Sequence, residues 1–145
     1  MDLTTYSREK VEALCREMRD HPGKLTTFEL RHFFAPGLYG REIFIPAGQL
    51  MVGKVHLRDH LCIVLGDLSI YSTDGLKRFE GYHHFTTKAG AQRTAYAHTD
   101  AWFTTIHANP GDERDIAKIE ARNVSDDFSL IDHFPDELKL IGATV

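Results

Sequence analysis

Hydrophobic and polar residues follow a helical spacing at the start of the chain. One apolar stripe shows the i, i+3, i+4, i+7 spacing of a buried helix face: Val11, Leu14, Cys15 and Met18. Ser7 is a preferred N-cap residue, and Gly23 is a common helix terminator. The pattern therefore predicts a helical N-terminal segment over residues 1–40.

From Arg41 to Asn109 the spacing changes to short apolar or alternating runs that are separated by turn residues. These runs predict short strands over 42–45, 50–56, 60–65, 68–71, 77–85, 94–97 and 101–107. Gly66-Asp67 is expected to end the third strand, and Asp74-Gly75 is a typical hairpin signal. Because no helical pattern separates the strands, we expect an antiparallel, all-β sandwich or barrel.

A second helical pattern follows the β region. Asp112 is a suitable N-cap for a helix that runs to about Arg122, with Ile116 and Ile119 on its inner face. Phe128–Ile141 is apolar but irregular, and we interpret it as a segment that packs against the barrel or another subunit. The predicted organisation is one domain over 1–145, with a β-barrel core at 41–109 and a C-terminal helix and packing segment at 110–145.

Composition narrows the class of protein but indicates no activity. The chain has 145 residues, a net charge of −4, 42% hydrophobic and 26% charged residues, which is typical of one globular domain. No apolar run approaches the roughly 20 residues that span a bilayer, and lysines and arginines do not cluster. We therefore expect neither a membrane nor a nucleic acid as partner. Cys15 and Cys62 lie in apolar contexts, which favours buried free thiols and a cytoplasmic location.

Histidines are the strongest candidates for chemistry. Of the nine, six lie between residues 56 and 107: His56, His60, His83, His84, His98 and His107. His56 and His60 flank a short turn, and strand parity allows both to project into one barrel mouth together with Lys54. Imidazole is a common ligand of divalent metals. His83 and His84 are adjacent and point to opposite strand faces, so a structural role is expected for them.

Two segments resemble the motifs of the cupin superfamily. Lys54–Leu68 resembles the first motif, which carries His-x-His and a glutamate and ends in an apolar stretch like Val64-Leu65-Gly66-Asp67-Leu68. Lys88–Arg93 resembles the second motif segment, Pro-x-Gly-x-x-His. The resemblance implies a cupin-type double-stranded β-helix, or jelly-roll barrel, with helical additions at both ends.

A narrower resemblance covers Arg41–His107. Ile45-Pro46-Ala47-Gly48 and Trp102–His107 are similar to segments of small single-domain cupin-like proteins of tailed bacteriophages. This resemblance implies a location in the host cytosol, but it brings no settled activity.

The cupin resemblance also implies where a metal would bind. The family's ligand positions fall on Lys54, His56, His60 and Arg93. Only His56 keeps the family's residue type, and His60 stands in place of a glutamate. A metal would therefore need His98 or His107 as a third ligand.

Three functions are open from the sequence. In the first, His56, His60 and one of His98 or His107 bind a divalent metal such as Zn, Ni, Fe or Mn. In the second, a metal-free electropositive pocket binds a nucleotide or sugar phosphate, through Lys54, His56, His60, Arg93 and the aromatic Trp102. In the third, the histidines are ordinary wall residues of an interaction module. The fold does not assign a reaction, so enzymatic activity is left open.

Apolar residues beyond the needs of one small barrel predict self-association. His60–Leu65 is apolar on both strand faces, and Phe128–Ile141 adds further large apolar side chains. Uncovered apolar patches usually mark interfaces, and twofold symmetry is the commonest. We therefore expect a homo-oligomer, most simply a dimer.

Overall fold

A computed structural model describes residues 9, 13, 28–72 and 75–125. Most of the expected N-terminal helix, residue Asp74 of the expected hairpin turn and the segment after Ser125 lie outside the described residues. The described elements, in chain order, are β1 (Glu29–Ala35), β2 (Leu38–Ile45), β3 (Leu50–Val52), β4 (Val55–His56), β5 (His60–Ser72), β6 (Gly75–Thr87), β7 (Thr94–Ala97), β8 (Ala101–Ala108), α2 (Ile116–Asn123) and β9 (Val124–Ser125).

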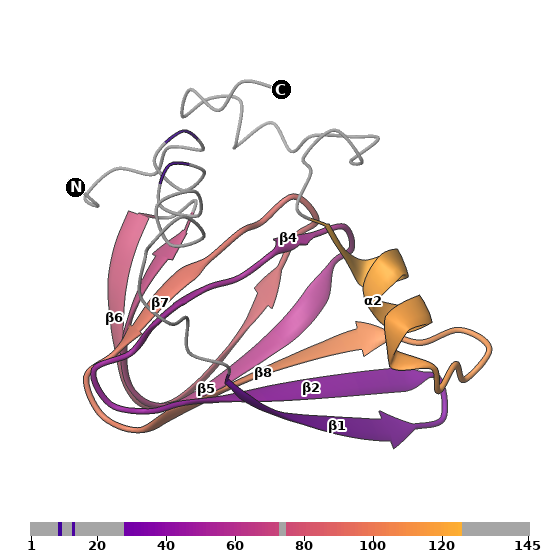
Figure 1. The fold of residues 1–145 in the computed structure, drawn as a ribbon, viewed down its shortest axis with the longest axis horizontal. Helices are drawn as coiled ribbons and strands as arrows, with labels where there is room; N and C mark the ends of the chain where they lie inside the picture. The colour runs from indigo at the N-terminus through magenta and orange to yellow at the C-terminus, as the bar shows by residue number, and fades with distance from the viewer. Residues whose placement is uncertain (1–8, 10–12, 14–27, 73–74, 126–145) are drawn as a thin grey trace, which may run out of the picture.

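The strands form one curled antiparallel sheet and a small second ladder (Figure 1). The path of the main sheet is β1-β2-β8-β5-β7-β3, and β6 pairs with β5; β4 pairs separately with β9. One edge of β5 pairs with β8 over Leu61–Leu65 and then with β7 over Leu68–Tyr71. Because β5 changes partners along its length, the sheet bends around it into a half-barrel.

Gly66 marks the point at which β5 changes partners. Its φ of +127° lies in a region that side chains rarely adopt. A Cβ at this position would lie 2.7 Å from the Asp100 carbonyl oxygen and 2.9 Å from Ala101 Cβ. Glycine therefore lets β5 continue as one strand of 13 residues. The expectation that Gly66-Asp67 ends the strand is wrong, because the glycine bends the strand without breaking its pairing with β6.

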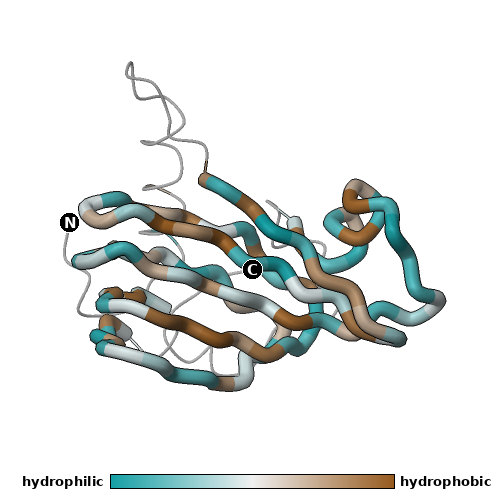
Figure 2. Tube along the Cα trace, turned by 90° about the horizontal axis from the view of Figure 1, so that it is seen from below, coloured by the Kyte–Doolittle hydropathy of each residue, from teal (hydrophilic) through white to brown (hydrophobic). Residues whose placement is uncertain are grey.

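The inner face of the sheet carries the core, as the period of two predicts. Ten buried residues make up one cluster: Ile45, Met51, Cys62, Val64, Leu68, Ile70, Ala95, Ala97, Ala101 and Phe103. Most of their neighbours along the strands are more exposed, and hydrophilic and hydrophobic stretches occur within the same strands in Figure 2. The outer face includes Leu61, Leu65 and Trp102, which are exposed.

The β region begins at Glu29, so the expected boundary between a helical segment and a barrel at residue 41 is wrong. Strands β1 and β2 form a hairpin around Pro36-Gly37, where Gly37 has a φ of +72°. This turn suits a proline followed by a glycine. Strand β1 lies at the sheet edge and is mostly exposed, so it lacks the polar and apolar alternation of a half-buried strand.

Helix α2 begins three residues later than predicted. Its N-cap is Asp115, whose Oδ1 accepts hydrogen bonds from the backbone N–H groups of Ala117 (3.0 Å) and Lys118 (3.4 Å). Asp112 instead has a φ of +52° and accepts a hydrogen bond from Gly37 N at 2.7 Å. Asp112 therefore fixes the β1–β2 turn, not the helix. In the described part of the chain, no helix is long and apolar enough to cross a membrane.

Candidate metal centre

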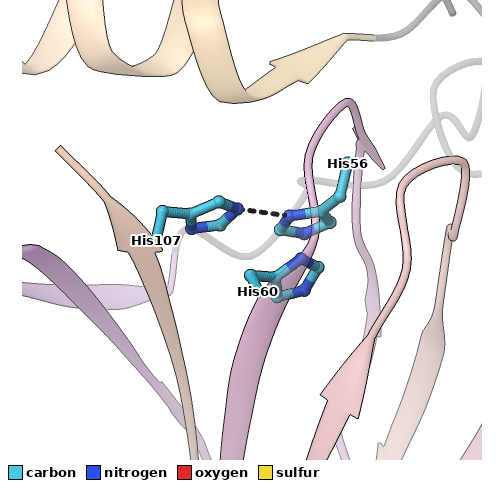
Figure 3. Close-up of side chains that lie close together, drawn as sticks. All are labelled: His56, His60 and His107. Atoms are coloured by element: carbon cyan, nitrogen blue, oxygen red, sulfur yellow. Dashed lines mark hydrogen bonds between the residues drawn. The ribbon is translucent and has the colours of Figure 1, made fainter. Parts of the chain in front are cut away.

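Three strands bring His56, His60 and His107 together at one end of the curled sheet (Figure 3). His56 ends β4, His60 begins β5 and His107 lies near the end of β8. In the antiparallel β5–β8 ladder, Leu61 pairs with Ile106. His60 and His107 are the next residues along these two strands, so they lie opposite each other and face the inner side of the sheet. The spatial cluster therefore joins residues from three separate strands, and we call it the histidine cluster.

The β4 segment is held in place by its backbone. His56 N donates to Ala91 O at 2.9 Å, and Gly90 N donates to His56 O at 2.7 Å. On its other side, His56 pairs with Val124 in the short β4–β9 ladder. Leu57 N also donates to Asn123 O at 2.8 Å, at the end of α2. These bonds fix the backbone from which the His56 ring projects.

The three rings are in direct contact, but they are not equivalent. His56 Nδ1 lies 3.2 Å from His107 Nε2, and these two rings are nearly parallel at 8° with centroids 5.3 Å apart. Because the two nitrogens are close while the ring centroids are further apart, the His56 and His107 rings meet edge to edge. The His60 ring stacks against both, with centroids 4.1 Å from His56 and 4.5 Å from His107.

Burial lowers the pKa of each of the three imidazoles and so favours the neutral form. Burial lowers the pKa of His56 to about 2, and the nearby His60, His107, Arg93 and Arg41 add to this effect. Burial likewise lowers the pKa of His107 to about 4. Burial also lowers the pKa of His60, although its hydrogen bond to the Arg58 carbonyl acts in the opposite direction. Neutral imidazole is the form that binds metals.

One hydrogen bond assigns the proton on His60. Its Nδ1 lies 3.0 Å from Arg58 O, and a carbonyl only accepts, so Nδ1 carries the hydrogen. His60 Nε2 therefore bears a lone pair, and it is buried without a hydrogen-bond partner among the described residues. Metal-ligating histidines typically donate their other ring N–H to a carbonyl in this way.

The donor set fits a transition metal in type and in spacing. One nitrogen from each ring lies within 4.8 Å of the others. Two nitrogens bound at about 2.05 Å in tetrahedral geometry lie about 3.3 Å apart, which matches the 3.2 Å between His56 Nδ1 and His107 Nε2. An imidazole lone pair lies in the ring plane, so three-point binding requires the stacked His60 ring to turn.

A cavity of about 270 Å³ adjoins the histidine cluster, because His56 belongs to the cluster and also lines the cavity. Lys54 and Arg93 line this cavity too, as the sequence suggested for an electropositive pocket. Arg41 also lines it, from β2. Sequence reasoning missed Arg41 because nothing local marks it; its only signal is that it has the same parity along β2 as the inward-facing Ile43 and Ile45.

Two other predicted site residues lie elsewhere. His98 is exposed and its Nε2 lies 2.7 Å from Ser69 Oγ, so the third member of the cluster is His107 and not His98. Trp102 is 37% exposed on the outer face, where its ring lies 5.3 Å from that of Phe44. Trp102 therefore does not line the cavity, because its strand neighbours Ala101 and Phe103 take the inward positions.

Comparison with known proteins identifies the fold alone. No protein-family model and no curated protein sequence matches the chain. Among solved structures, salicylate 1,2-dioxygenase from Pseudoaminobacter salicylatoxidans aligns at a TM-score of 0.52 and 13% identity, over 79% of this chain and 33% of that one. A cupin superfamily protein from Desulfitobacterium hafniense aligns at a TM-score of 0.49 and 10% identity, over 63% and 85%.

A further match is an RmlC-like cupin with a double-stranded β-helix fold from Methanocaldococcus jannaschii, at a TM-score of 0.48 and 11% identity, over 61% of this chain and 86% of that one. The prediction of a mostly β fold is confirmed by the described strands, and the structural neighbours include cupin proteins. The bacteriophage resemblance stays a prediction from the sequence.

Proposed function

We propose that this protein binds one divalent transition metal through His56, His60 and His107. The observation that carries the proposal is the meeting of three neutral, largely buried imidazoles from three strands within 4.8 Å. Unpaired buried nitrogen is unfavourable, and a bound cation would satisfy the lone pair of His60 Nε2.

The ligand set differs from the one that the cupin resemblance implies. Lys54 and Arg93, which stand at two of the family's ligand positions, line the adjoining cavity, and His107 from β8 joins His56 and His60. The described cluster contains no carboxylate. Neutral imidazole suits Zn, Ni, Fe and Cu, whereas Mn and Mg prefer oxygen ligands. We therefore expect Zn²⁺ and Ni²⁺ to bind more tightly than Mn²⁺.

The chemistry that such a site offers depends on its open positions. Three protein ligands leave at least one position for water or another ligand, as in catalytic zinc sites. A metal bound there would act as a Lewis acid and lower the pKa of bound water. The protein's own contribution is to hold three neutral donors and to keep Arg41 and Arg93 beside them.

Calorimetric titration of chelator-treated protein tests the proposal. Zn²⁺ should bind with one site per chain, and His56→Ala, His60→Ala and His107→Ala should each weaken binding at least tenfold. His98→Ala is the matched control, because that exposed histidine lies outside the cluster. Binding that is equally weakened by His98→Ala, or is unaffected by all three cluster substitutions, would contradict the proposal.

A further inference from the structure

The cavity beside the histidine cluster is lined by both apolar and positively charged side chains. Apolar walls come from separate strands, with Ile43 on β2, Met51 on β3 and Phe103 on β8. Three cationic side chains also line the cavity: Arg41, Lys54 and Arg93. None of the described lining residues is acidic. The cavity therefore combines an apolar interior with an excess of positive charge.

Arg41 carries the strongest indication of an absent partner. It pairs across the sheet with Thr105 and lies on the inner face of β2. Its Nε is buried and has no hydrogen-bond partner among the described residues. A guanidinium group carries a positive charge and only donates hydrogen bonds. A buried charged donor without a partner is unfavourable, so an anion in this cavity would relieve the cost.

The second arginine is held near the same end of the cavity. The Arg93 guanidinium carbon lies 5.0 Å from the centroid of the Phe85 ring, and Nη1 lies 3.7 Å from Cys62 Sγ. Arg93, Arg41 and His56 all line this cavity. Lys54 is exposed at the cavity and adds a third positive charge.

We propose that this cavity binds a small compound with an apolar body and a carboxylate group, with Arg41 as the main contact of the carboxylate and Arg93 and Lys54 in support. Arginine presents paired N–H donors that match a carboxylate. The volume of about 270 Å³ is below the roughly 300–1,000 Å³ of typical ligand pockets, which favours a compound of about one ring. The apolar walls would leave the hydroxyl groups of a nucleotide or sugar phosphate without partners.

This proposal deepens the proposed function, because a ligand in the cavity would lie beside His56 and any metal there. It rests on the proposed function only for that placement, since the arginines can bind an anion without a metal. A test in chelator-treated protein therefore separates the two: carboxylate binding can survive when metal binding fails, and metal binding can survive when carboxylate binding fails.

Four probes, titrated into chelator-treated full-length protein, test the ligand class. Benzoate supplies a ring and a carboxylate, and benzamide has the same shape without the charge. Inorganic phosphate supplies charge without a ring, and adenosine monophosphate tests the nucleotide alternative. Benzoate should bind at least tenfold more tightly than benzamide and inorganic phosphate. Equal binding of benzoate and benzamide, tighter binding of adenosine monophosphate, or no binding of benzoate at millimolar concentration would overturn the proposal.

Two variants test the residues. Arg41→Gln should weaken benzoate binding about tenfold or more, since hydrogen bonds to charged groups are the stronger class. Arg31→Gln is the matched control, because Arg31 is exposed on β1, pairs with Glu42 at 3.4 Å and does not line the cavity. If Arg41→Gln does not fold, Lys54→Gln at the exposed rim replaces it, with an expected loss of at least twofold. Equal losses in Arg31→Gln and the cavity variant would contradict the assignment.

Discussion

His56 Nδ1 lies 3.2 Å from His107 Nε2, although 51 residues separate the two along the chain. In this hydrogen bond, one of the two nitrogens carries the proton and the other accepts it. A metal between them would take the place of that proton and bind both lone pairs. Both the hydrogen bond and a bound metal require His56 and His107 to be neutral imidazoles. Protonation of either ring at low pH would therefore disrupt the site and destabilise the fold.

The metal-free protein should lose stability as the pH falls below about 6.5. The folded state lowers the pKa of His56 to about 2 and that of His107 to about 4, whereas an unfolded histidine titrates near 6.5. Between these values the unfolded chain binds more protons, so the free energy of unfolding decreases toward low pH. Each such histidine contributes a slope of at most about 1.4 kcal/mol per pH unit.

Urea denaturation of chelator-treated protein at pH 7.5, 6 and 5 measures this slope. Carboxyl groups also titrate toward pH 5, so the comparison is between variants. His107→Gln should show a shallower slope than the parent, because it removes one histidine whose pKa the fold lowers. An unchanged slope in His107→Gln would show that His107 is not held neutral by the fold.

Gly66 and Gly81 offer a matched test of the bend in β5, since they face each other in the β5–β6 ladder. Both have positive φ, +127° and +86°, but only at Gly66 would a Cβ meet other atoms within 4 Å. Gly66→Ala should reduce the free energy of unfolding by about 2–4 kcal/mol, from strain and overpacking together. Gly81→Ala should lose only about 1 kcal/mol from its backbone conformation. Equal losses in chemical denaturation would argue against a steric role for the close approach at Gly66.

Strand parity explains how much of the fold the sequence could predict. The β region shows its period of two clearly at β8, where Ala101, Phe103, Thr105 and His107 are buried and the intervening residues are more exposed. By contrast, β1 and the bend in β5 depend on tertiary structure. An exposed edge strand has no amphipathic pattern, and a glycine within a strand looks like a terminator until its close contacts are known.

The candidate site could be predicted in part. The short turn between His56 and His60 indicated that these two residues would face one space, and the structure places their ring centroids 4.1 Å apart. The choice between His98 and His107 depended on which end of the sheet each occupies, which strand pairing decides and local sequence does not. Arg41 required the same long-range information, because the pairing of β2 with β8 brings this residue to the site.

Self-association remains a prediction from the sequence, and the outer sheet face is consistent with it. Apolar residues lie next to one another across the strands: Phe44 pairs with Trp102, and Trp102 pairs with Leu65. Leu65 is 45% exposed in the described structure. We expect a dimer by light scattering at micromolar concentration, and Leu65→Lys should shift the mass toward that of one 16.5 kDa chain. A monomeric parent protein would contradict this prediction.

Ring-nitrogen NMR of histidine-labelled protein tests the metal site most directly, because it reports each imidazole separately. On addition of one equivalent of Zn²⁺ to chelator-treated protein, the ¹⁵N signals of His56 Nδ1, His60 Nε2 and His107 Nε2 should move together, and those of His98 should stay in place. The His60 shift is decisive, since the stacked ring must turn to bind. A response from His98, or none from the His60 ring, would contradict a three-histidine metal centre.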